Sequence, residues 1–462
     1  MRSFIASLAV VALLGHNAVA DNCATGAFNE KGNWYCQAVK KISYSGFEGQ
    51  GHYNEITGMD KATGTCSSKP RYYSGSLSPL DEEVSVHFRG PLKLKQFAAY
   101  SVPATSSKSK RDIHQRRHVH GHQRHHAHKR NEDIEFQERA EAAMRRAEEK
   151  RAVGDMVTAT INGQVVSWAN TYDGHNEGQP AGQPAEQPAA QSTGSHVEAP
   201  SSGFIGAKPN SSPAQFAPAP AASGDWSRIG YFNSDSKTAE GVTFLNNKGG
   251  QGSGVWDTTF GNSLAYASQD SLSGSANPVT FGGDLNTGLA ELVIMTDKKC
   301  NNDCGYTREG TVAYHGFDGP SKAFFFEFQM PHEGQTGWNL DMPAMWLLNA
   351  QIPRVAQYPP TPGCSCWTSG CGEFDIVEVL DSGNKKCKST LHSNLKGGDS
   401  DYIDRPVDSF MKLAVVMTGA EIHIEVLDSS FDFGKTMSGD AINKILGRND
   451  KLTVSNFKLV AS

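Results

Sequence analysis

Long hydrophobic runs are scarce in this 462-residue chain. Apart from an apolar run from Phe4 to Leu14, no segment reaches the roughly 18 residues that a membrane-spanning helix needs. Residues 451–462 also lack the hydrophobic tail of a lipid-anchor signal. We therefore expect a protein that is soluble or retained in a cell wall, without a membrane anchor.

A strong excess of either charge is also missing. The chain has 43 Lys and Arg against 49 Asp and Glu, which gives a formal net charge of −6 at pH 7. Nucleic acids are held largely by clustered basic side chains. The charge balance therefore gives no reason to expect a nucleic-acid partner.

The apolar run near the amino terminus fits a secretory signal in residues 1–20. Arg2 precedes the run, and the small residues Ala-Val-Ala at 18–20 form a cleavage site ahead of Asp21. The run is too short to cross a bilayer. We expect a mature protein that begins near Asp21 and is secreted to the extracellular space or the cell wall.

Nine cysteines in an exported chain are expected to form disulfide bonds. Cys23, Cys36 and Cys66 lie near the amino terminus and would leave one thiol unpaired. Three bridges within one domain are predicted for the other six, which are Cys300, Cys304, Cys364, Cys366, Cys371 and Cys387. A zinc cluster of the last four is the alternative, but their spacing matches no common zinc finger.

Residues 21–100 mix turn formers with short aromatic and β-branched runs such as Val84–Phe88. This pattern predicts a small Gly-rich β module that contains cysteine. Its aromatic residues have two candidate roles, a sugar-binding surface and core packing, of which packing is the commoner.

A basic, histidine-rich and charged spacer is expected in residues 101–152. Seven histidines lie between His114 and His128, among several arginines. Such a tract can bind metal, or it can be an exposed spacer. Three dibasic pairs add a third hypothesis, cleavage by a processing protease of the secretory pathway, which we rank above metal binding; they are Lys110-Arg111, Lys129-Arg130 and Lys150-Arg151.

Two further segments precede the long carboxyl-terminal part. Residues 153–170 predict a hairpin, because Asn162-Gly163 is a preferred type I′ turn pair between two β-rich runs. Residues 171–222 read as an extended disordered linker rich in Pro, Gly, Ala and Gln. Asn210 begins a glycosylation sequon within this linker.

Residues 223–462 show no long helical period. Short hydrophobic runs separated by turn residues predict an all-β sandwich. The predicted strands include 292–295, 323–330, 344–348, 373–380, 413–417 and 422–427.

The most unusual stretch is Gly372–Leu380, a strand-like apolar run that carries Glu373, Asp375 and Glu378. Alternate residues of a strand share a face, so Glu373 and Asp375 point one way and Glu378 the other. One extra residue in a β-bulge would bring all three to one face, and bulges are over-represented beside active sites.

Two carboxylates on either side of a glycosidic bond are what glycoside hydrolysis requires, one as nucleophile or base and one as general acid. Three like charges on one face cannot all ionise cheaply, so at least one should have a raised pKa, as a proton donor needs. From spacing alone, a solvated strand face and an acidic Ca²⁺-binding strand remain the alternatives.

Aromatic side chains flank this stretch. Trp338, Trp346 and Trp367 precede it, and His392 follows it. A sugar ring offers apolar faces and a rim of hydroxyl groups, so these residues are candidates for substrate binding. Core packing is the alternative for each tryptophan.

Four segments, taken in this order, resemble the catalytic domain of glycoside hydrolase family 16, the laminarinase-like retaining enzymes. They are Glu327 in a strand-like run, Pro343–Leu347, Gly372–Glu378 and Thr390–His392. Met342 stands where the family has a tryptophan, which removes one sugar-stacking contact. The layout of signal, cysteine-containing module, low-complexity spacer and β domain also resembles fungal cell-wall glycosidases of the Tos type.

This resemblance implies a concanavalin-like β-jelly-roll with a concave cleft for β-1,3-glucan. It implies Glu373 as nucleophile, Glu378 as acid/base and Asp375 as the residue that controls the protonation of the nucleophile, with no metal or cofactor. The implied function is an endo-acting hydrolase or transglycosidase of the cell wall. The alternative is a non-catalytic structural glycoprotein that binds glucan.

Overall fold

The computed structural model describes residues 27–102, 156–161, 164–169, 224–393, 395–398, 400–447 and 453–459. The predicted signal, Cys23, the spacer beyond residue 102, the linker and Asn210 lie outside the described residues. Contacts divide the chain into two compact units, one of residues 1–17 and 107–215 and one of residues 18–106 and 216–462.

The smaller unit contains the predicted hairpin. Strands β8 (Met156–Ile161) and β9 (Gln164–Ala169) pair antiparallel, with Ile161 opposite Gln164. This antiparallel pairing is the one expected of the predicted hairpin. Its predicted turn residues, Asn162 and Gly163, lie outside the described residues.

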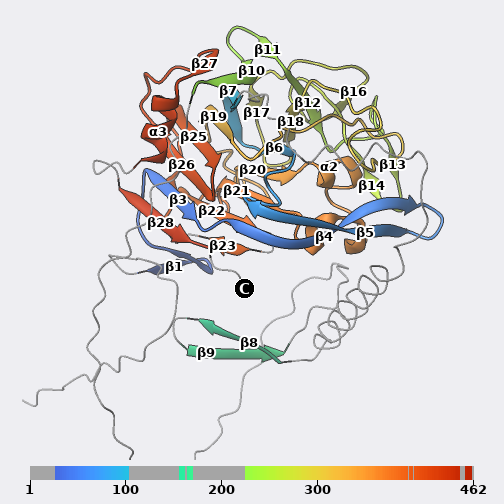
Figure 1. The fold of residues 1–462 in the computed structure, drawn as a ribbon, viewed down its shortest axis with the longest axis horizontal. Coiled ribbons are helices and arrows are strands. Elements are labelled where there is room, and N and C mark those ends of the chain that lie inside the picture. Colours follow the sequence, from blue (N-terminus) through green and yellow to red (C-terminus); the bar gives the residue numbers. More distant parts are fainter. Residues whose placement is uncertain are drawn as a thin grey trace, which may run out of the picture. The chain divides into compact units, whose positions relative to one another are not determined.

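The larger unit contains two ten-stranded sheets (Figure 1). In spatial order, the path of the first sheet is β11 (Thr238–Glu240), β10 (Trp226–Asn233), β7 (Leu92–Ser101), β19 (Lys322–Gln329), β25 (Met411–Thr418), β26 (Glu421–Leu427), β3 (Lys41–Ser45) and β28 (Val454–Lys458). Two short strands join this path at its side: β17 (Asp284–Leu285) and β27 (Thr436–Met437).

The second sheet has a path of nine strands and one strand at its side. In spatial order it contains β16 (Gly274–Ser275), β15 (Ala265–Ala267), β12 (Val242–Asn246), β18 (Glu291–Thr296), β6 (Val84–Arg89), β20 (Ala344–Asn349), β21 (Glu373–Glu378), β22 (Lys386–His392) and β23 (Lys396–Gly398), with β24 (Ile403–Asp404) beside β22. All six strands predicted in residues 223–462 are therefore present.

Three further strand pairs and four short helical elements complete the described part of this unit, and the paired strands are two to thirteen residues long. The strand pairs are β1 (Phe28–Glu30) with β2 (Asn33–Tyr35), β4 (Glu48–Asp60) with β5 (Thr65–Ser76), and β13 (Trp256–Asp257) with β14 (Gly261–Asn262). The helical elements are α2 (Gln351–Val355), η2 (Pro362–Cys364), η3 (Cys366–Ser369) and α3 (Gly439–Leu446). None of the helices in the described residues has the length and hydrophobicity needed to cross a membrane.

The prediction that residues 21–100 form a separate module is wrong. Strand β6 lies between β18 and β20 in the second sheet, and β7 lies between β10 and β19 in the first. Strand β3 pairs with β26 and with β28. The amino-terminal segment therefore supplies interior strands of the same two sheets, whose neighbours come from residues 223–462.

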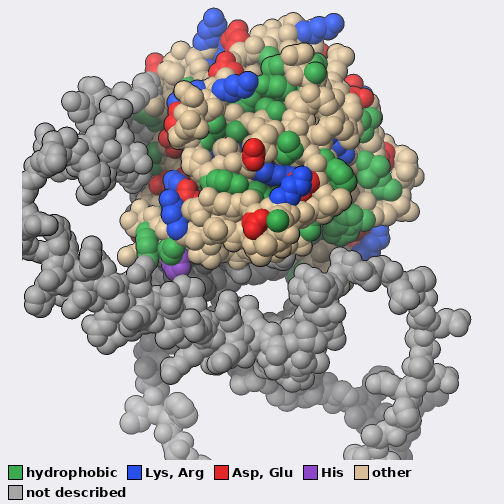
Figure 2. All heavy atoms as spheres, turned by 90° about the vertical axis from the view of Figure 1, so that its right-hand side faces the viewer, with side chains coloured by type: hydrophobic (Ala, Val, Ile, Leu, Met, Phe, Trp, Pro, Cys, Tyr) green, Lys and Arg blue, Asp and Glu red, His purple; other side chains and the backbone are tan. Residues whose placement is uncertain are grey.

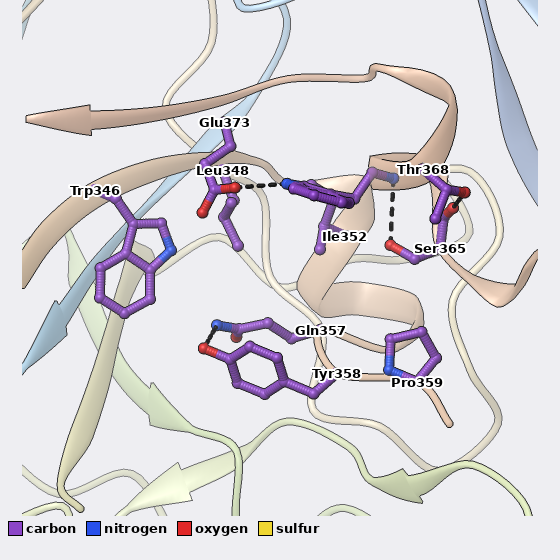
Figure 3. Close-up of a pocket in the computed structure, with 10 residues that line it drawn as sticks. Trp346, Leu348, Ile352, Gln357, Tyr358, Pro359, Ser365, Thr368 and Glu373 are labelled. Atoms are coloured by element: carbon purple, nitrogen blue, oxygen red, sulfur yellow. Dashed lines mark hydrogen bonds between the residues drawn. The ribbon is translucent and has the colours of Figure 1, made fainter. Parts of the chain in front are cut away.

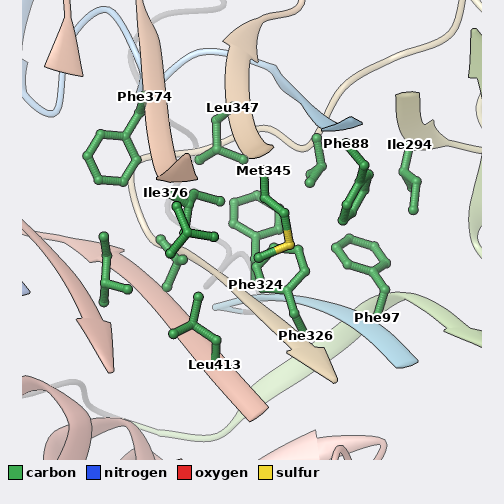
Figure 4. Packing of buried hydrophobic residues seen from close by; sticks show 14 of the residues in the cluster. Phe88, Phe97, Ile294, Phe324, Phe326, Met345, Leu347, Phe374, Ile376 and Leu413 are labelled. Atoms are coloured by element: carbon green, nitrogen blue, oxygen red, sulfur yellow. The ribbon is translucent and has the colours of Figure 1, made fainter. Parts of the chain in front are cut away.

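The main core fills the space between the two sheets (Figure 4). Phe97, Phe324 and Phe326 reach into it from the first sheet, and Phe88 and Met345 reach into it from the second. The Phe88 and Phe326 ring centroids are 6.0 Å apart. Burial of aromatic side chains from both sheets stabilises the face-to-face packing.

The outer face of the first sheet is covered by α3. Phe325 and Val416 point away from the main core and pack with Ile442 and Ile445 of this helix. Both faces of β19 are therefore buried, which explains why its sequence is a continuous run of phenylalanines and not an alternating one.

The cysteines pair differently from the prediction. Cys300 bonds Cys304 and Cys366 bonds Cys371, but Cys364 bonds Cys66, which lies 298 residues earlier in the chain. The hairpin of β4 and β5 packs against η2 and η3, and this contact brings Cys66 to Cys364. Because three of the four cysteines of the zinc alternative are in disulfides, that cluster does not form.

Two more cysteines show which thiol is left unpaired. Cys36 is disulfide-bonded. Cys387 is a free thiol buried in the main core, where packing and not pairing accounts for it. The unpaired thiol is therefore in the carboxyl-terminal set, and the prediction of three bridges within that set is wrong.

Candidate active site

The acidic strand β21 contains the predicted bulge. Against β20, Met345 pairs with Val377 and Trp346 pairs with Asp375, so Ile376 has no partner residue of its own. The register with β22 also shifts between Asp375 and Glu378. One extra residue on β21 is what a β-bulge is.

The bulge brings the three carboxylates to one face. Glu373, Asp375 and Glu378 stand opposite Leu348, Trp346 and Ala344, three alternate residues of β20. Residues directly opposite each other in a sheet share a face. The outcome agrees with the hypothesis that the spacing suggested, and the intervening side chains point to the other side, into the main core: Phe374, Ile376 and Val377.

Gly372 sets the entry to this strand. Its φ is +109°, a conformation that side-chain-bearing residues rarely adopt. A Cβ atom there would also lie 2.8 Å from Cδ2 of Leu80, which belongs to the amino-terminal segment. The glycine before Glu373 is therefore required both by the turn and by the close approach of this segment.

Glu373 occupies a largely buried, polar position. Burial and the nearby charge of Asp375 raise the pKa of its carboxyl from 4.5 to about 7. Trp367 donates a hydrogen bond from Nε1 to Oε2 of Glu373 at 2.5 Å, and this bond lowers the pKa of the carboxyl. Glu373 can therefore exchange a proton near neutral pH.

Glu378 is held by an arginine from the amino-terminal segment. Arg89 donates from Nη2 to Oε1 of Glu378 at 3.1 Å and from Nε to the carbonyl oxygen of Met342 at 2.8 Å. Burial and the charge of Asp375 raise the pKa of Glu378, whereas Arg89 lowers it. The carboxyl is thus oriented by a fixed cation while it keeps a raised pKa.

Asp375 lies between the two glutamates and pairs with His392. His392 Nε2 is 3.1 Å from Oδ2 of Asp375. This hydrogen bond raises the pKa of His392, so the imidazolium form is favoured beside the carboxylates. His392 therefore supplies positive charge to the acidic face, and its contact with substrate stays a prediction.

The predicted tryptophans have three different environments. Trp346 is buried, and its ring stacks on His87 of β6 with centroids 5.2 Å apart. Trp367 is half exposed and touches Glu373. Trp338 is 85% exposed in the loop before β20 and does not line the pocket described below.

Glu327, which matched the family pattern, lies on the other sheet. It accepts hydrogen bonds from Lys95 at 3.0 Å and from Gln96 at 2.6 Å, both on strand β7. It therefore belongs to the first sheet and not to the acidic face.

A pocket of about 470 Å³ opens beside Glu373 (Figure 3). Trp346 and Leu348 of β20 line it together with Trp367. Gln357 and Tyr358, from the segment that follows α2, line the opposite side. The pocket has the size and mostly apolar lining of a small-ligand site, with a few polar groups.

Sequence reasoning missed four residues of this face: His87, Arg89, Gln357 and Tyr358. A signal was present for the first two, since Ser85, His87 and Arg89 alternate with valine and phenylalanine in β6. Polar residues on alternate positions of a buried strand indicate a polar face, as they did for β21. Gln357 and Tyr358 carried no such pattern, because they lie outside regular strands.

Two family models match the chain. Residues 40–102 match the amino-terminal part, and residues 224–445 the carboxyl-terminal part, of a family described as "Cell wall protein YJL171C/Tos1". These two ranges contain every strand of the two sheets except β28.

Similar proteins from three fungi cover nearly the whole chain. One from Arthroderma benhamiae, named "Probable circularly permuted 1,3-beta-glucanase", is 41% identical over 94% of this chain and 95% of its own length. The proteins named "Probable circularly permuted 1,3-beta-glucanase TOS1" from Candida albicans and Saccharomyces cerevisiae are 39% and 36% identical, over 93% and 90% of this chain and 95% and 92% of theirs.

No solved structure matches the chain significantly. Family membership thus rests on the two family models and on these relatives, and it agrees with the Tos-type resemblance that the layout of the chain suggested. The chain belongs to the Tos1/YJL171C family of cell wall proteins.

Proposed function

We propose that this protein is a glycoside hydrolase that acts on β-1,3-glucan in the fungal cell wall. The observation that carries the proposal is the bulge in β21, which places Glu373, Asp375 and Glu378 on one face. Glycoside hydrolysis needs two carboxyl groups with different protonation states. The names of the relatives support β-1,3-glucan as the substrate.

The fold assignment that accompanies this function is a concanavalin-like β-jelly-roll in a circularly permuted chain order. A permutation changes the order of strands along the chain but not their neighbours in a sheet. In support, β7 and β10 pair antiparallel with Ser101 opposite Ser227, which lies 126 positions later in the sequence. The strands on either side of that long segment are neighbours, as joined original ends of a chain would be.

In the proposed mechanism, the carboxylate of Glu373 attacks the anomeric carbon while Glu378 donates its proton to the leaving glycosidic oxygen. The bond to the leaving sugar breaks as the Glu373–sugar ester bond forms. Glu378, now ionised, then removes a proton from water or from a sugar hydroxyl, whose oxygen displaces Glu373. The configuration at the anomeric carbon is retained.

The charged neighbours fit these roles. The N–H group of Trp367 and the cationic form of His392 lower the pKa of Glu373, against burial and Asp375, which together raise it to about 7. Ionised Glu373, which the nucleophilic step requires, is therefore the major form above about pH 7. The raised pKa of Glu378 favours its protonated form, which the acid step requires. Asp375 raises both pKa values and holds His392 beside them.

The acceptor in the second step decides between hydrolysis and transglycosylation. Water gives shortened glucan chains, and a sugar hydroxyl gives a transferred chain. The face of the molecule in Figure 2 carries acidic and basic side chains interspersed with hydrophobic ones. Both acceptors are included in the proposal.

Product analysis on linear β-1,3-glucan tests the function. NMR of the earliest products should show the β anomer, and Glu373→Gln and Glu378→Gln should each lower turnover by about 10²- to 10⁴-fold. Initial formation of the α anomer would refute Glu373 as nucleophile.

The second candidate function is a non-catalytic wall glycoprotein that binds glucan. The largely apolar pocket beside Glu373 supports this second function, since a pocket can bind a ligand without catalysis. Wild-type protein that binds β-1,3-glucan without cleaving or transferring it would favour this second function.

A further inference from the structure

The pocket beside Glu373 has a wall that the acidic motif does not predict. This wall is the segment of residues 357–368, defined here as the 357–368 wall, which follows α2 and leads into β21. Figure 3 shows Glu373 and Trp346 at one side of the pocket and Pro359 at the other. The cavity thus runs from a candidate catalytic carboxylate to this wall.

One residue that lines this cavity has an unsatisfied polar atom. Gln357 is 92% buried and lines the pocket, and its Oε1 has no hydrogen-bond partner among the described residues. Its Nε2 donates to the hydroxyl oxygen of Tyr358 at 3.0 Å. This oxygen has almost no accessible surface, and a buried amide oxygen without a partner is costly, so a rotation of the amide toward a hydrogen-bond donor in the pocket would be favoured.

Tyr358 is an exposed aromatic ring that is nevertheless fixed in place. The side chain is 60% exposed, and its hydroxyl donates to the carboxylate of Glu291, with distances of 3.0 and 3.2 Å to the two oxygens. Glu291 belongs to β18 of the second sheet. The ring is therefore held by its polar end while the aromatic face stays available for stacking.

The 357–368 wall is anchored at its beginning by the hydrogen bond from Tyr358 to Glu291 and at its end by disulfides. Disulfides join Cys364 to Cys66 of β5 and Cys366 to Cys371. The hydroxyl of Ser365 accepts a hydrogen bond from the backbone N–H of Trp367 at 3.2 Å. A wall held this way loses little conformational freedom when a ligand binds, which favours affinity.

We propose that the 357–368 wall forms a sugar-binding subsite that takes a β-1,3-glucosyl ring next to the scissile bond, with Tyr358 as stacking platform and Gln357 as hydroxyl acceptor. The proposal rests on the proposed function for the type of sugar. A pyranose ring fits the chemistry of the pocket, because its C–H faces suit Tyr358 and Trp367 and its hydroxyl groups can donate to Oε1 of Gln357.

The test is calorimetric binding of β-1,3-gluco-oligosaccharides of increasing length. We choose the Glu378→Gln background, because Glu378 does not line the pocket and the variant should not turn the ligands over. Adding Tyr358→Ala should raise the dissociation constant about tenfold, and adding Gln357→Leu about fivefold. Tyr358→Phe should lie between the unchanged background and Tyr358→Ala, because it keeps the ring and loses the bond to Glu291.

Tyr72 provides the matched control. It is 63% exposed on β5 and does not line the pocket, so Tyr72→Ala should leave the dissociation constant unchanged. Unchanged affinity in both Tyr358→Ala and Gln357→Leu, with thermal unfolding as in the background, would overturn the subsite. Wild-type protein that binds the oligosaccharides through Tyr358 without cleaving them would refute the proposed catalysis and leave the subsite standing.

Discussion

Strands β21 and β6 lie in the same sheet with β20 between them, and they present polar side chains to the same face. In β21 these are carboxylates in a motif that can be recognised from sequence. In β6 they are His87 and Arg89, opposite Trp346 and Ala344, and no motif marks them. The two strands also come from the two separately matched segments of the family.

The difference shows that a local motif identifies the reactive groups but not the residues that control them. Glu378 is reactive only in the orientation and protonation state that its neighbours allow, and Arg89 is the cation that contacts it. That contact depends on the order of strands in the sheet, since Arg89 and Glu378 are separated by 289 residues in sequence.

The largest effect on activity should come from truncating the side chains of the two glutamates of β21. Glu373→Ala and Glu378→Ala should each slow the turnover of glucan about 10²- to 10⁴-fold. With an activated β-1,3-glucosyl fluoride and added azide, Glu378→Ala should give the β-glycosyl azide, because azide intercepts the ester on Glu373. Glu373→Ala should give the α-glycosyl azide, because azide takes the place of the nucleophile.

Glu327→Gln is the control for this pair, since that carboxylate lies on the first sheet and its amide can still accept from Lys95. It should keep the turnover rate of the wild type. Exchanged azide products, α from Glu378→Ala and β from Glu373→Ala, would reverse the assigned roles of the two glutamates.

The next effect should come from Arg89, the residue of β6 that orients Glu378. Arg89→Met should lower kcat by up to about a hundredfold, because the carboxyl loses its orientation. Arg89 also lowers the pKa of Glu378, so its removal raises that pKa and should move the alkaline limb of the pH–rate profile to higher pH. Arg89→Lys keeps the charge and should restore most of the limb position.

A purely structural role for Arg89 predicts something else. Both variants would then lower activity equally at every pH, and the alkaline limb would stay where the wild type has it. The pH–rate profile on linear β-1,3-glucan therefore separates positioning from general damage to the fold.

Much of the second half of the fold could be predicted because its signals are local. β26 alternates Ile422 and Ile424 with His423 and Glu425, and alternation requires only that one face be buried. The bulge in β21 was also local, because three charges in an apolar strand make sense only on one face.

The pairing partners could not be predicted, because strand order depends on contacts between distant segments. The run Val84–Phe88 was recognisable as β-rich, yet nothing in it specifies insertion between β18 and β20. The bond between Cys66 and Cys364 could not be predicted for the same reason, since it depends on how the hairpin of β4 and β5 packs on η2 and η3. Cysteine counting by region assumed separate domains, which the sheets do not have.

A smaller effect concerns stability. Glu373 has a pKa raised from 4.5 to about 7 in the folded protein, so the unfolded state releases this proton at lower pH than the folded state. Wild-type stability should therefore fall as pH rises from about 4.5 to about 7 and stay level above, by at most about 3 kcal/mol from this group. Glu373→Gln removes the cost.

Thermal unfolding across this pH range checks the prediction. The gain in Tm of Glu373→Gln over wild type should grow between pH 4.5 and 7 and then remain constant. In an Asp375→Asn background the gain in Tm from Glu373→Gln should reach its constant value at a lower pH, because Asp375 is one of the causes of the raised pKa of Glu373. A gain that does not vary with pH would contradict a raised pKa at Glu373.

The smallest effect on activity should come from the imidazole of His87, whose comparison with His392 sharpens the contrast between the two strands. Burial lowers the pKa of His87 to about 3, while the bond to Asp375 raises the pKa of His392. His87 should therefore stay neutral from pH 4 to 8, and His392 should titrate above its usual range near 6.5.

NMR titration of the two imidazoles measures this directly. The His87 resonances should not shift over that range, and Asp375→Asn should lower the midpoint of His392 without changing His87. Because neutral His87 acts by stacking on Trp346, His87→Phe should keep the ring contact and alter turnover less than Arg89→Met does. A titration of His87 near neutral pH would mean that water reaches β6 under Trp346, and that the acidic face is wetter than its burial indicates.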